Sequence, residues 1–238
     1  MAKKSKNKSD HADSIGTTLR DHELARLTEH VRTKAKAARR KGSTRAIVDE
    51  LLFFLLADAG LKPKEICDLN INDIPDRQKS HALRVRLRSP RRQRQVRVSR
   101  QTAKLINEFA QVNRQGARDS DPLLISERGN RLGYISIYNK IRRLGQKVGL
   151  HGLHPNTLRK TCMLRLFQKE QNLRLVQQQA GHASHKTTVQ YLKSSVDSLS
   201  GPCDACGHPI WDNAGKRIDS GHLLCPQCLT AFHRKAKH

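Results

Sequence analysis

Apolar residues follow two different periods along the chain, one typical of helices and one typical of strands. From Thr18 to Arg40 they recur every three to four positions, which predicts a helix with one buried face. That face carries Leu19, Leu24, Leu27 and Val31. The following stretch, AIVDELLFFLLADAG, is apolar almost all round, so it predicts a second, wholly buried helix between a capping Ser43 and a terminal Gly60.

Between residues 83 and 98 the period shortens to two. Leu83, Val85 and Leu87 alternate with arginines, and Val96 and Val98 flank a further arginine beyond the segment SPRRQ. Alternation of this kind predicts a β-hairpin with one apolar face and one arginine face.

Helical patterns return on both sides of this hairpin. The short helix PKEICDL precedes it, and longer helices are predicted near Gln101–Asn113 and Ser136–Lys147. Three more follow Pro155, of which the second ends at Gly181 and the third is capped by Ser184. Together these elements predict a mainly helical α+β fold with a small antiparallel sheet.

The charge of the chain adds an expected partner to this picture. Lys and Arg number 46 against 21 Asp and Glu, which gives a formal net charge of +25. Such an excess repels itself in a compact fold unless a polyanion compensates it, so nucleic acid is the first candidate partner. Eight arginines lie between residues 84 and 100 without an acidic residue, whereas an ordinary solvated strand mixes both signs. The expected contacts with nucleic acid there are Arg84, Arg86, Arg88, Arg91, Arg92, Arg94 and Arg97.

Membrane and secretory features are not expected. The sequence has no apolar run long enough to span a bilayer, and no apolar segment follows its basic start. We expect residues 1–17 to form a disordered basic arm and the protein to be cytoplasmic, associated with the nucleoid in a prokaryote.

Residues 194–201 are rich in serine and predict a linker, and residues 202–238 predict a zinc-binding module. Two C-x2-C pairs, eighteen residues apart, lie in the module: Cys203 with Cys206, and Cys225 with Cys228. Each pair brings two thiolates to one metal through a tight turn, so the spacing predicts a zinc ribbon or a related knuckle fold. Four thiolates fill a tetrahedral site, so we expect a structural Zn²⁺; His208 and His222 are alternative ligands.

The segments AGLKPKEICDLNINDI, PNTLRKT and GHASHKTTVQYL resemble the catalytic domain of tyrosine recombinases, the phage integrase family, within residues 18–193. In this resemblance Tyr191 stands at the nucleophile, Arg159 at the second active-site arginine and His182 at the late His or Trp. Glu65 stands at the acidic residue that supports the first arginine. The resemblance implies an enzyme that breaks and rejoins double-stranded DNA, its expected partner, through a 3′-phosphotyrosyl intermediate, associates with itself on DNA and needs no catalytic cofactor.

The chemistry of these side chains suits that reaction. Cutting a phosphodiester needs a nucleophile, stabilisation of the charge on a five-coordinate phosphorus and a proton for the leaving 5′ oxygen. A phenol can attack and hold the DNA end covalently, an arginine fork can bind two phosphate oxygens, and a histidine can donate a hydrogen bond or move a proton.

The chain departs from the family pattern at two positions. Lys62 stands where the first arginine is expected, and it keeps the charge but loses the bidentate fork. Asn156 stands where an early histidine is expected, and it cannot shuttle a proton near pH 7. His151 and His154 are the alternatives for that role.

The chain also differs from the family pattern at the hairpin turn and at Lys160, the residue after Arg159. The family has a lysine at this turn as general acid, whereas this turn offers arginines, which are poor proton donors: Arg88, Arg91 and Arg92. Lys160 stands where the family often has His and adds to the DNA-binding set.

Three functions therefore remain open. The chain is a site-specific recombinase or integrase of a divergent branch, or a weakened or inactive relative that keeps the DNA-binding surface. From another class, it is a zinc-ribbon adaptor whose helical body contacts nucleic acid.

Overall fold

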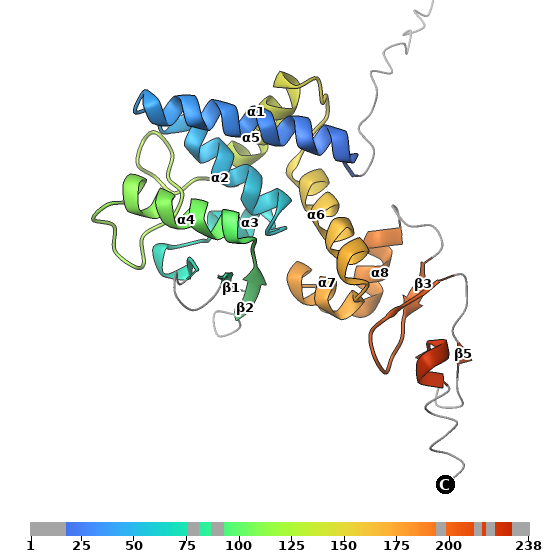
Figure 1. The fold of residues 1–238 in the computed structure, drawn as a ribbon. Coiled ribbons are helices and arrows are strands. Elements are labelled where there is room, and N and C mark those ends of the chain that lie inside the picture. Colours follow the sequence, from blue (N-terminus) through green and yellow to red (C-terminus); the bar gives the residue numbers. More distant parts are fainter. Residues whose placement is uncertain are drawn as a thin grey trace, which may run out of the picture.

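The computed structural model describes residues 18–75, 81–86, 93–193, 199–211, 216–217 and 222–229, most of which are helical (Figure 1). The helices are α1 (Asp21–Arg40), α2 (Arg45–Ala57), α3 (Pro63–Cys67), η1 (Ile71–Asp73, a 3-10 turn), α4 (Arg100–Asn113), α5 (Tyr134–Lys147), α6 (Pro155–Glu170), α7 (Leu173–Ala180) and α8 (His185–Lys193). The strands are β1 (Ala82–Arg86), β2 (Gln93–Arg97), β3 (Leu199–Pro202), β4 (Pro209–Trp211), β5 (Lys216–Arg217) and β6 (Leu223–Leu224).

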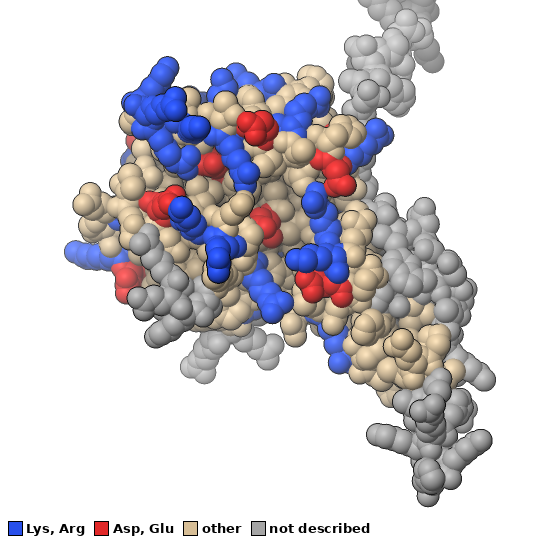
Figure 2. Space-filling model, viewed as in Figure 1, with Lys and Arg blue, Asp and Glu red and all other residues tan. Residues whose placement is uncertain are grey.

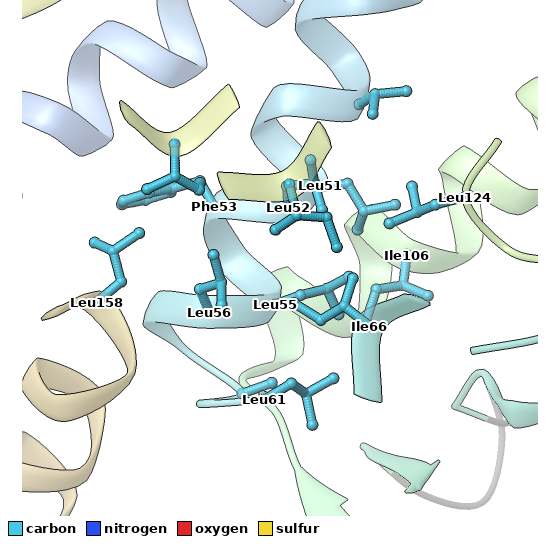
Figure 3. Close-up of a cluster of buried hydrophobic side chains, with 14 of the residues drawn as sticks. Leu51, Leu52, Phe53, Leu55, Leu56, Leu61, Ile66, Ile106, Leu124 and Leu158 are labelled. Carbon is cyan, nitrogen blue, oxygen red and sulfur yellow. The ribbon is translucent and has the colours of Figure 1, made fainter. Parts of the chain in front are cut away.

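Helix α2 lies at the centre of the main hydrophobic core. Its leucines 51, 52, 55 and 56 are fully buried and point toward side chains of surrounding elements, such as Ile106 of α4 and Leu158 of α6 (Figure 3). Because α2 is apolar almost all round, it can pack at once against α1, α4, α5 and α6. The predicted burial of this helix is therefore correct.

The first helix begins later than the sequence pattern predicts. It starts at Asp21, with the Glu23 carboxylate accepting a hydrogen bond from the Arg20 backbone N at 2.8 Å. Leu19 lies outside the helix but still packs in the main hydrophobic core, and its backbone N donates to Thr161 Oγ1 of α6 at 2.8 Å.

The start of the second helix also differs from the prediction. Thr44 rather than Ser43 precedes α2, and its side chain makes no capping hydrogen bond. Packing, rather than a cap, holds this helix.

The hairpin has the predicted antiparallel pairing, and its register decides which side chains face the core. Leu83 pairs with Val96, and Val85 pairs with Arg94, so these four side chains share the inner face. The outward positions carry Ala82, Arg84, Arg86, Gln93, Gln95 and Arg97. Leu87 to Arg92 lie outside the described residues.

A second, smaller hydrophobic cluster joins α6, α7 and α8, and it includes Phe167, Val176 and Leu192. The predicted helix ends are found here: Gly181, at φ +64°, follows α7, and Ser184 Oγ accepts from Thr187 N at 3.3 Å at the start of α8. The main core and this cluster meet along α6 (Figure 1).

The mainly helical α+β architecture with a small antiparallel sheet is confirmed. Beyond α8, β3 pairs with β4 and β5 pairs with β6, both antiparallel. Strand β3 packs against α8 and begins at Leu199, a residue that the sequence pattern placed in the linker. Among the described helices, none has the length and apolarity needed to cross a membrane.

Candidate active site and cysteine cluster

Arg159 connects the two hydrophobic clusters. It lies on the second turn of α6, which Pro155 begins, and only 3% of its surface is exposed. Its Nη1 donates to the Gly60 carbonyl after α2, and its Nη2 donates to the Ala180 carbonyl at the end of α7 at 2.6 Å. These bonds fix the guanidinium between the α2–α3 turn and the α7–α8 turn.

Tyr191 projects from α8 toward the start of α6. Its hydroxyl donates to Asn156 Oδ1 at 3.2 Å. The Tyr191 ring centroid lies 5.1 Å from that of His182 and 6.0 Å from Arg159 Cζ. The structure therefore brings together the tyrosine, the histidine and the arginine that the sequence singled out.

Two ionisable groups here have shifted pKa values. Burial, followed by the charges of Arg159 and Lys62, lowers the pKa of His182 to about 4. Burial raises the pKa of Tyr191, although Arg159 acts in the opposite direction. Both side chains are therefore neutral at pH 7.

The His182 ring is held by its own turn. Its Nδ1 lies 3.1 Å from the buried Thr188 Oγ1, and its backbone N donates to the Gln177 carbonyl at 3.2 Å. Nothing in the sequence pattern singled out Thr188, although a polar residue on the buried face of a predicted helix is a usable signal.

The positions that depart from the family pattern lie at the same place. Asn156 is exposed on the first turn of α6 and accepts the Tyr191 hydrogen bond. Lys62 is exposed immediately before α3, and its charge helps to lower the pKa of His182. Lys160 Nζ lies 5.6 Å from the Tyr191 ring centroid, and burial lowers the pKa of this lysine.

Glu65 is paired with an arginine of the hairpin. Arg94 Nη1 and Nη2 donate to Glu65 Oε1 and Oε2 at 2.6 and 3.1 Å, and the Lys62 backbone N donates to Oε2 at 2.8 Å. Burial acts to raise the pKa of Glu65, but Arg94 outweighs it and the pKa is lowered. Arg94, expected as a DNA contact, instead has a side chain only 11% exposed.

The other predicted DNA contacts differ in their surroundings. Arg84 and Arg97 are exposed, whereas Arg86 forms an ion pair with Asp73 at 2.9 Å. Figure 2 shows Lys and Arg side chains spread over one face of the molecule, with fewer Asp and Glu between them. The remaining hairpin arginines, Arg88, Arg91 and Arg92, lie outside the described residues.

Gln179 is a buried residue of this region that sequence reasoning missed. Its Nε2 donates to the Ala59 and Arg97 carbonyls at 3.0 and 2.7 Å, and its Oε1 accepts from the Arg97 backbone N at 3.1 Å. The amide thus joins α7 to β2 and to the end of α2. Its two partner residues lie on distant segments, so no local pattern identifies them.

The four cysteines of the C-terminal module form one cluster. Their sulfurs all lie within 4.8 Å of one another, and the Sγ atoms of Cys206 and Cys225 are 3.8 Å apart. A tetrahedral zinc with Zn–S bonds of about 2.3 Å separates its sulfurs by about 3.8 Å, so the donor set fits one such ion. His222 Nδ1 instead lies 3.8 Å from Asp204 Oδ2.

This module contacts the start of α7. The Leu173 backbone N donates to the Gly207 carbonyl at 3.3 Å, and Arg174 Nη2 donates to the Asp204 carbonyl at 2.9 Å. The first cysteine pair therefore lies at one end of the helix whose other end supplies the Ala180 carbonyl to Arg159.

The sequence of the chain matches those of known proteins. Residues 17–197 match the Phage integrase family. The tyrosine recombinase XerC of Chromohalobacter salexigens is 29% identical over 170 residues, which cover 71% of this chain and 55% of the relative. The chain spans about half the length of the curated relatives it matches.

Solved structures show the same fold. The crystal structure of XerA recombinase has 26% identity and a TM-score of 0.61, covering 73% of this chain and 59% of that one. The XerH site-specific recombinase, in a post-cleavage complex with palindromic difH substrate, has 21% identity and a TM-score of 0.63, covering 80% and 53%.

Proposed function

Because the chain belongs to the phage integrase family of tyrosine recombinases, we propose that it breaks and rejoins DNA at specific sites through a 3′-phosphotyrosyl intermediate. The observation that supports this most is the meeting of the Tyr191 ring with His182, at 5.1 Å, and with Arg159, at 6.0 Å. A phenol, an imidazole and a guanidinium at one place are the groups that phosphoryl transfer to tyrosine needs.

In the proposed step the Tyr191 oxygen attacks the scissile phosphorus. A bond forms between this oxygen and phosphorus, and the bond from phosphorus to the 5′ oxygen breaks. The phenol loses one proton and the 5′ oxygen gains one, so the step changes neither the net protonation nor the number of phosphoester bonds. The 5′ hydroxyl of a DNA strand reverses the step without ATP.

Arg159 is the proposed phosphate ligand. Its two carbonyl bonds use only part of the guanidinium's donor set and hold it in one orientation. His182, neutral because its pKa is about 4, is the proposed hydrogen-bonding partner of the phosphate. Lys62 adds positive charge from the start of α3, and Asn156 holds the phenol by its hydroxyl.

Lys160 is the proposed proton donor to the 5′ oxygen. Its ammonium lies 5.6 Å from the Tyr191 ring, and its burial lowers its pKa, which makes it a stronger acid. The arginines at the hairpin turn have pKa values too high for this role.

DNA is the proposed substrate and partner. Arg84, Arg86 and Arg97, on the outward face of the hairpin, are proposed to bind the phosphate backbone, and Arg88, Arg91 and Arg92 are proposed with them. Binding through such contacts weakens steeply with salt and carries little sequence information. Self-association on DNA and a cytoplasmic location remain predictions.

The domain division also remains a proposal: a basic arm, a catalytic domain at residues 18–193 and a C-terminal metal module. Zn²⁺ is proposed as a structural ion on Cys203, Cys206, Cys225 and Cys228. Four thiolates leave no open coordination position, so the ion would stabilise the fold of the module and take no part in strand cleavage.

One observation favours a weakened relative as the second candidate. The phenol donates its hydrogen bond to Asn156, an amide that cannot accept the proton at pH 7. This candidate keeps the DNA-binding surface but cleaves slowly or not at all.

The test is covalent trapping on nicked duplexes of random sequence, in which the cleaved fragment diffuses away. We expect a protein–DNA adduct that survives denaturation and disappears in Tyr191→Phe. The matched control is Tyr134→Phe, which removes the hydroxyl of a tyrosine that is 57% exposed on α5, and its adduct should persist. An adduct that persists in Tyr191→Phe contradicts the assignment, and no adduct with the unaltered chain favours the second candidate.

A further inference from the structure

Among the described residues of the hairpin, Arg94 is the arginine that points inward. It lies opposite Val85 on the face that packs against the core, and its side chain is 11% exposed. Both terminal nitrogens bind the Glu65 carboxylate, and Nη2 also lies 3.4 Å from the Gln179 carbonyl of α7. One side chain from β2 therefore contacts α3 and α7.

The guanidinium also packs against the glycine that precedes His182. A Cβ added at Gly181 would lie 2.6 Å from Arg94 Nη1 and 2.7 Å from Cζ. Only a residue without a side chain leaves this space, and the φ of +64° at Gly181 favours glycine as well. Arg94 therefore sets how closely the His182 turn approaches Glu65.

This pairing matters because of the residue at position 62. Lys62 lies three residues before Glu65 and has no planar fork to pair with a carboxylate. The Glu65 carboxylate instead pairs with the guanidinium of Arg94 in the hairpin, through two hydrogen bonds of 2.6 and 3.1 Å. A buried carboxylate without that partner would repel the phosphate and lose its own fixed position.

We propose that Arg94 is a positioning residue for strand cleavage, which holds Glu65 and the Gly181–His182 turn in place and supplies the guanidinium that position 62 lacks. The proposal rests on the proposed cleavage function. It predicts that Arg94 acts on the rate of cleavage and not on the affinity for DNA, in contrast to the outward-facing arginines.

The first experiment compares Arg94→Met, Arg94→Lys and the control Lys104→Met, which removes a positive charge from the exposed surface of α4. Single-turnover cleavage is measured at saturating nicked duplex, together with the DNA dissociation constant at several salt concentrations. We expect Arg94→Met to slow cleavage about 10²-fold, the cost of a displacement of about 1 Å. Its dissociation constant and salt slope should match those of Lys104→Met.

Arg94→Lys keeps the charge and serves as a second test if the methionine variant misfolds. Thermal melting checks whether both variants are folded. We expect it to slow cleavage as well, because an ammonium cannot bind both carboxylate oxygens in plane. Cleavage by both Arg94 variants at the unaltered rate, or a loss confined to DNA affinity, would overturn the proposal.

The second experiment asks whether a guanidinium at position 62 replaces the one at position 94. Lys62→Arg is added to Arg94→Met, and a partial recovery of the cleavage rate is expected. A purely structural role of Arg94 predicts no recovery, so its absence in a folded double variant contradicts the proposal.

A third measurement does not depend on cleavage, so it separates this proposal from the proposed function. The pKa of His182 is followed by NMR in the unaltered chain and in Arg94→Met. Loss of the arginine charge, with Glu65 left in place, should raise the pKa of His182. An unchanged titration of His182 would show that Arg94 does not act on this turn, whether or not the chain cleaves DNA.

Discussion

Lys160 offers the sharpest test of the proposed reaction, because its charge and its proton can be removed separately. Lys160→Met removes both. Lys160→Arg keeps the charge at the same helical position but is a much weaker acid. If Lys160 protonates the leaving 5′ oxygen, both variants should be slow, and the arginine variant should lose only the part of the rate that proton transfer contributes.

The size of each part follows from the structure. A negative charge 5.6 Å from the ammonium, the distance from Lys160 Nζ to the Tyr191 ring, interacts with it by at most about 3 kcal/mol at an effective dielectric constant of about 20. Lys160 is partly exposed, so solvent reduces this value. The charge therefore contributes up to about 10²-fold in rate. Loss of general acid catalysis costs about 10²- to 10⁴-fold.

The assay uses a substrate in which sulfur replaces the bridging 5′ oxygen. A thiolate leaves without a proton, so this substrate does not need the general acid. We expect single-turnover cleavage of the sulfur substrate to be nearly equal in the unaltered chain and in Lys160→Arg, and reduced only by the charge effect in Lys160→Met. Arg159→Lys should stay slow on both substrates, because it impairs phosphate binding.

Two results would refute the reasoning. If Lys160→Arg cleaves the oxygen substrate at the unaltered rate, Lys160 does not donate the proton. If the Lys160 variants remain as slow on the sulfur substrate as on the oxygen substrate, their defect lies in another step.

Four further predictions concern stability, metal, pH and the altered positions. Gly60→Ala should destabilise the fold by about 2–5 kcal/mol, the sum of about 1–2 kcal/mol for a positive φ and about 1–3 kcal/mol for overpacking, since its Cβ would overlap Met163 Cε in the core. In urea titrations Gly116→Ala, also at positive φ but with no atom within 4 Å of the added Cβ, should cost only the first part. Chelation should release one metal ion per chain and raise hydrogen exchange in residues 199–229. Exchange should also rise at the start of α7, where Leu173 N is bound to the Gly207 carbonyl, while α2 stays protected. Equal exchange with and without chelator would contradict the metal assignment. The pKa of His182 is lowered to about 4, so between pH 4 and the ordinary 6.5 the folded chain binds fewer protons than the unfolded chain. The free energy of unfolding should therefore fall as the pH falls through this range, and it should fall less in His182→Gln. Lys62→Arg combined with Asn156→His should raise the cleavage rate of the otherwise unaltered chain, and a rate that does not rise would show that these positions do not limit cleavage.

Local patterns in the sequence predicted most of the elements. Period and composition suffice for α2, because a helix that is apolar almost all round has no stable position except the core. The alternation at β1 and β2 predicts a hairpin because it gives each strand one apolar face that must be buried. The cysteine spacing predicts a metal cluster because a knuckle turn is a local structure. The resemblance of PNTLRKT and GHASHKTTVQYL to tyrosine recombinases, rather than any period, selected Arg159, His182 and Tyr191.

Other features depend on contacts between segments far apart in the chain. Arg94 was counted among the outward arginines, although the alternation that buries Val96 also places Arg94 on the inner face. Its partner Glu65, 29 positions earlier, could not be identified from that alternation. Gln179 acquired its role from partners just after α2 and on β2, up to 120 positions away. A period along one segment specifies which side of that segment is buried, but the partner across the interface is decided by register and packing, which exist only once the whole chain has folded.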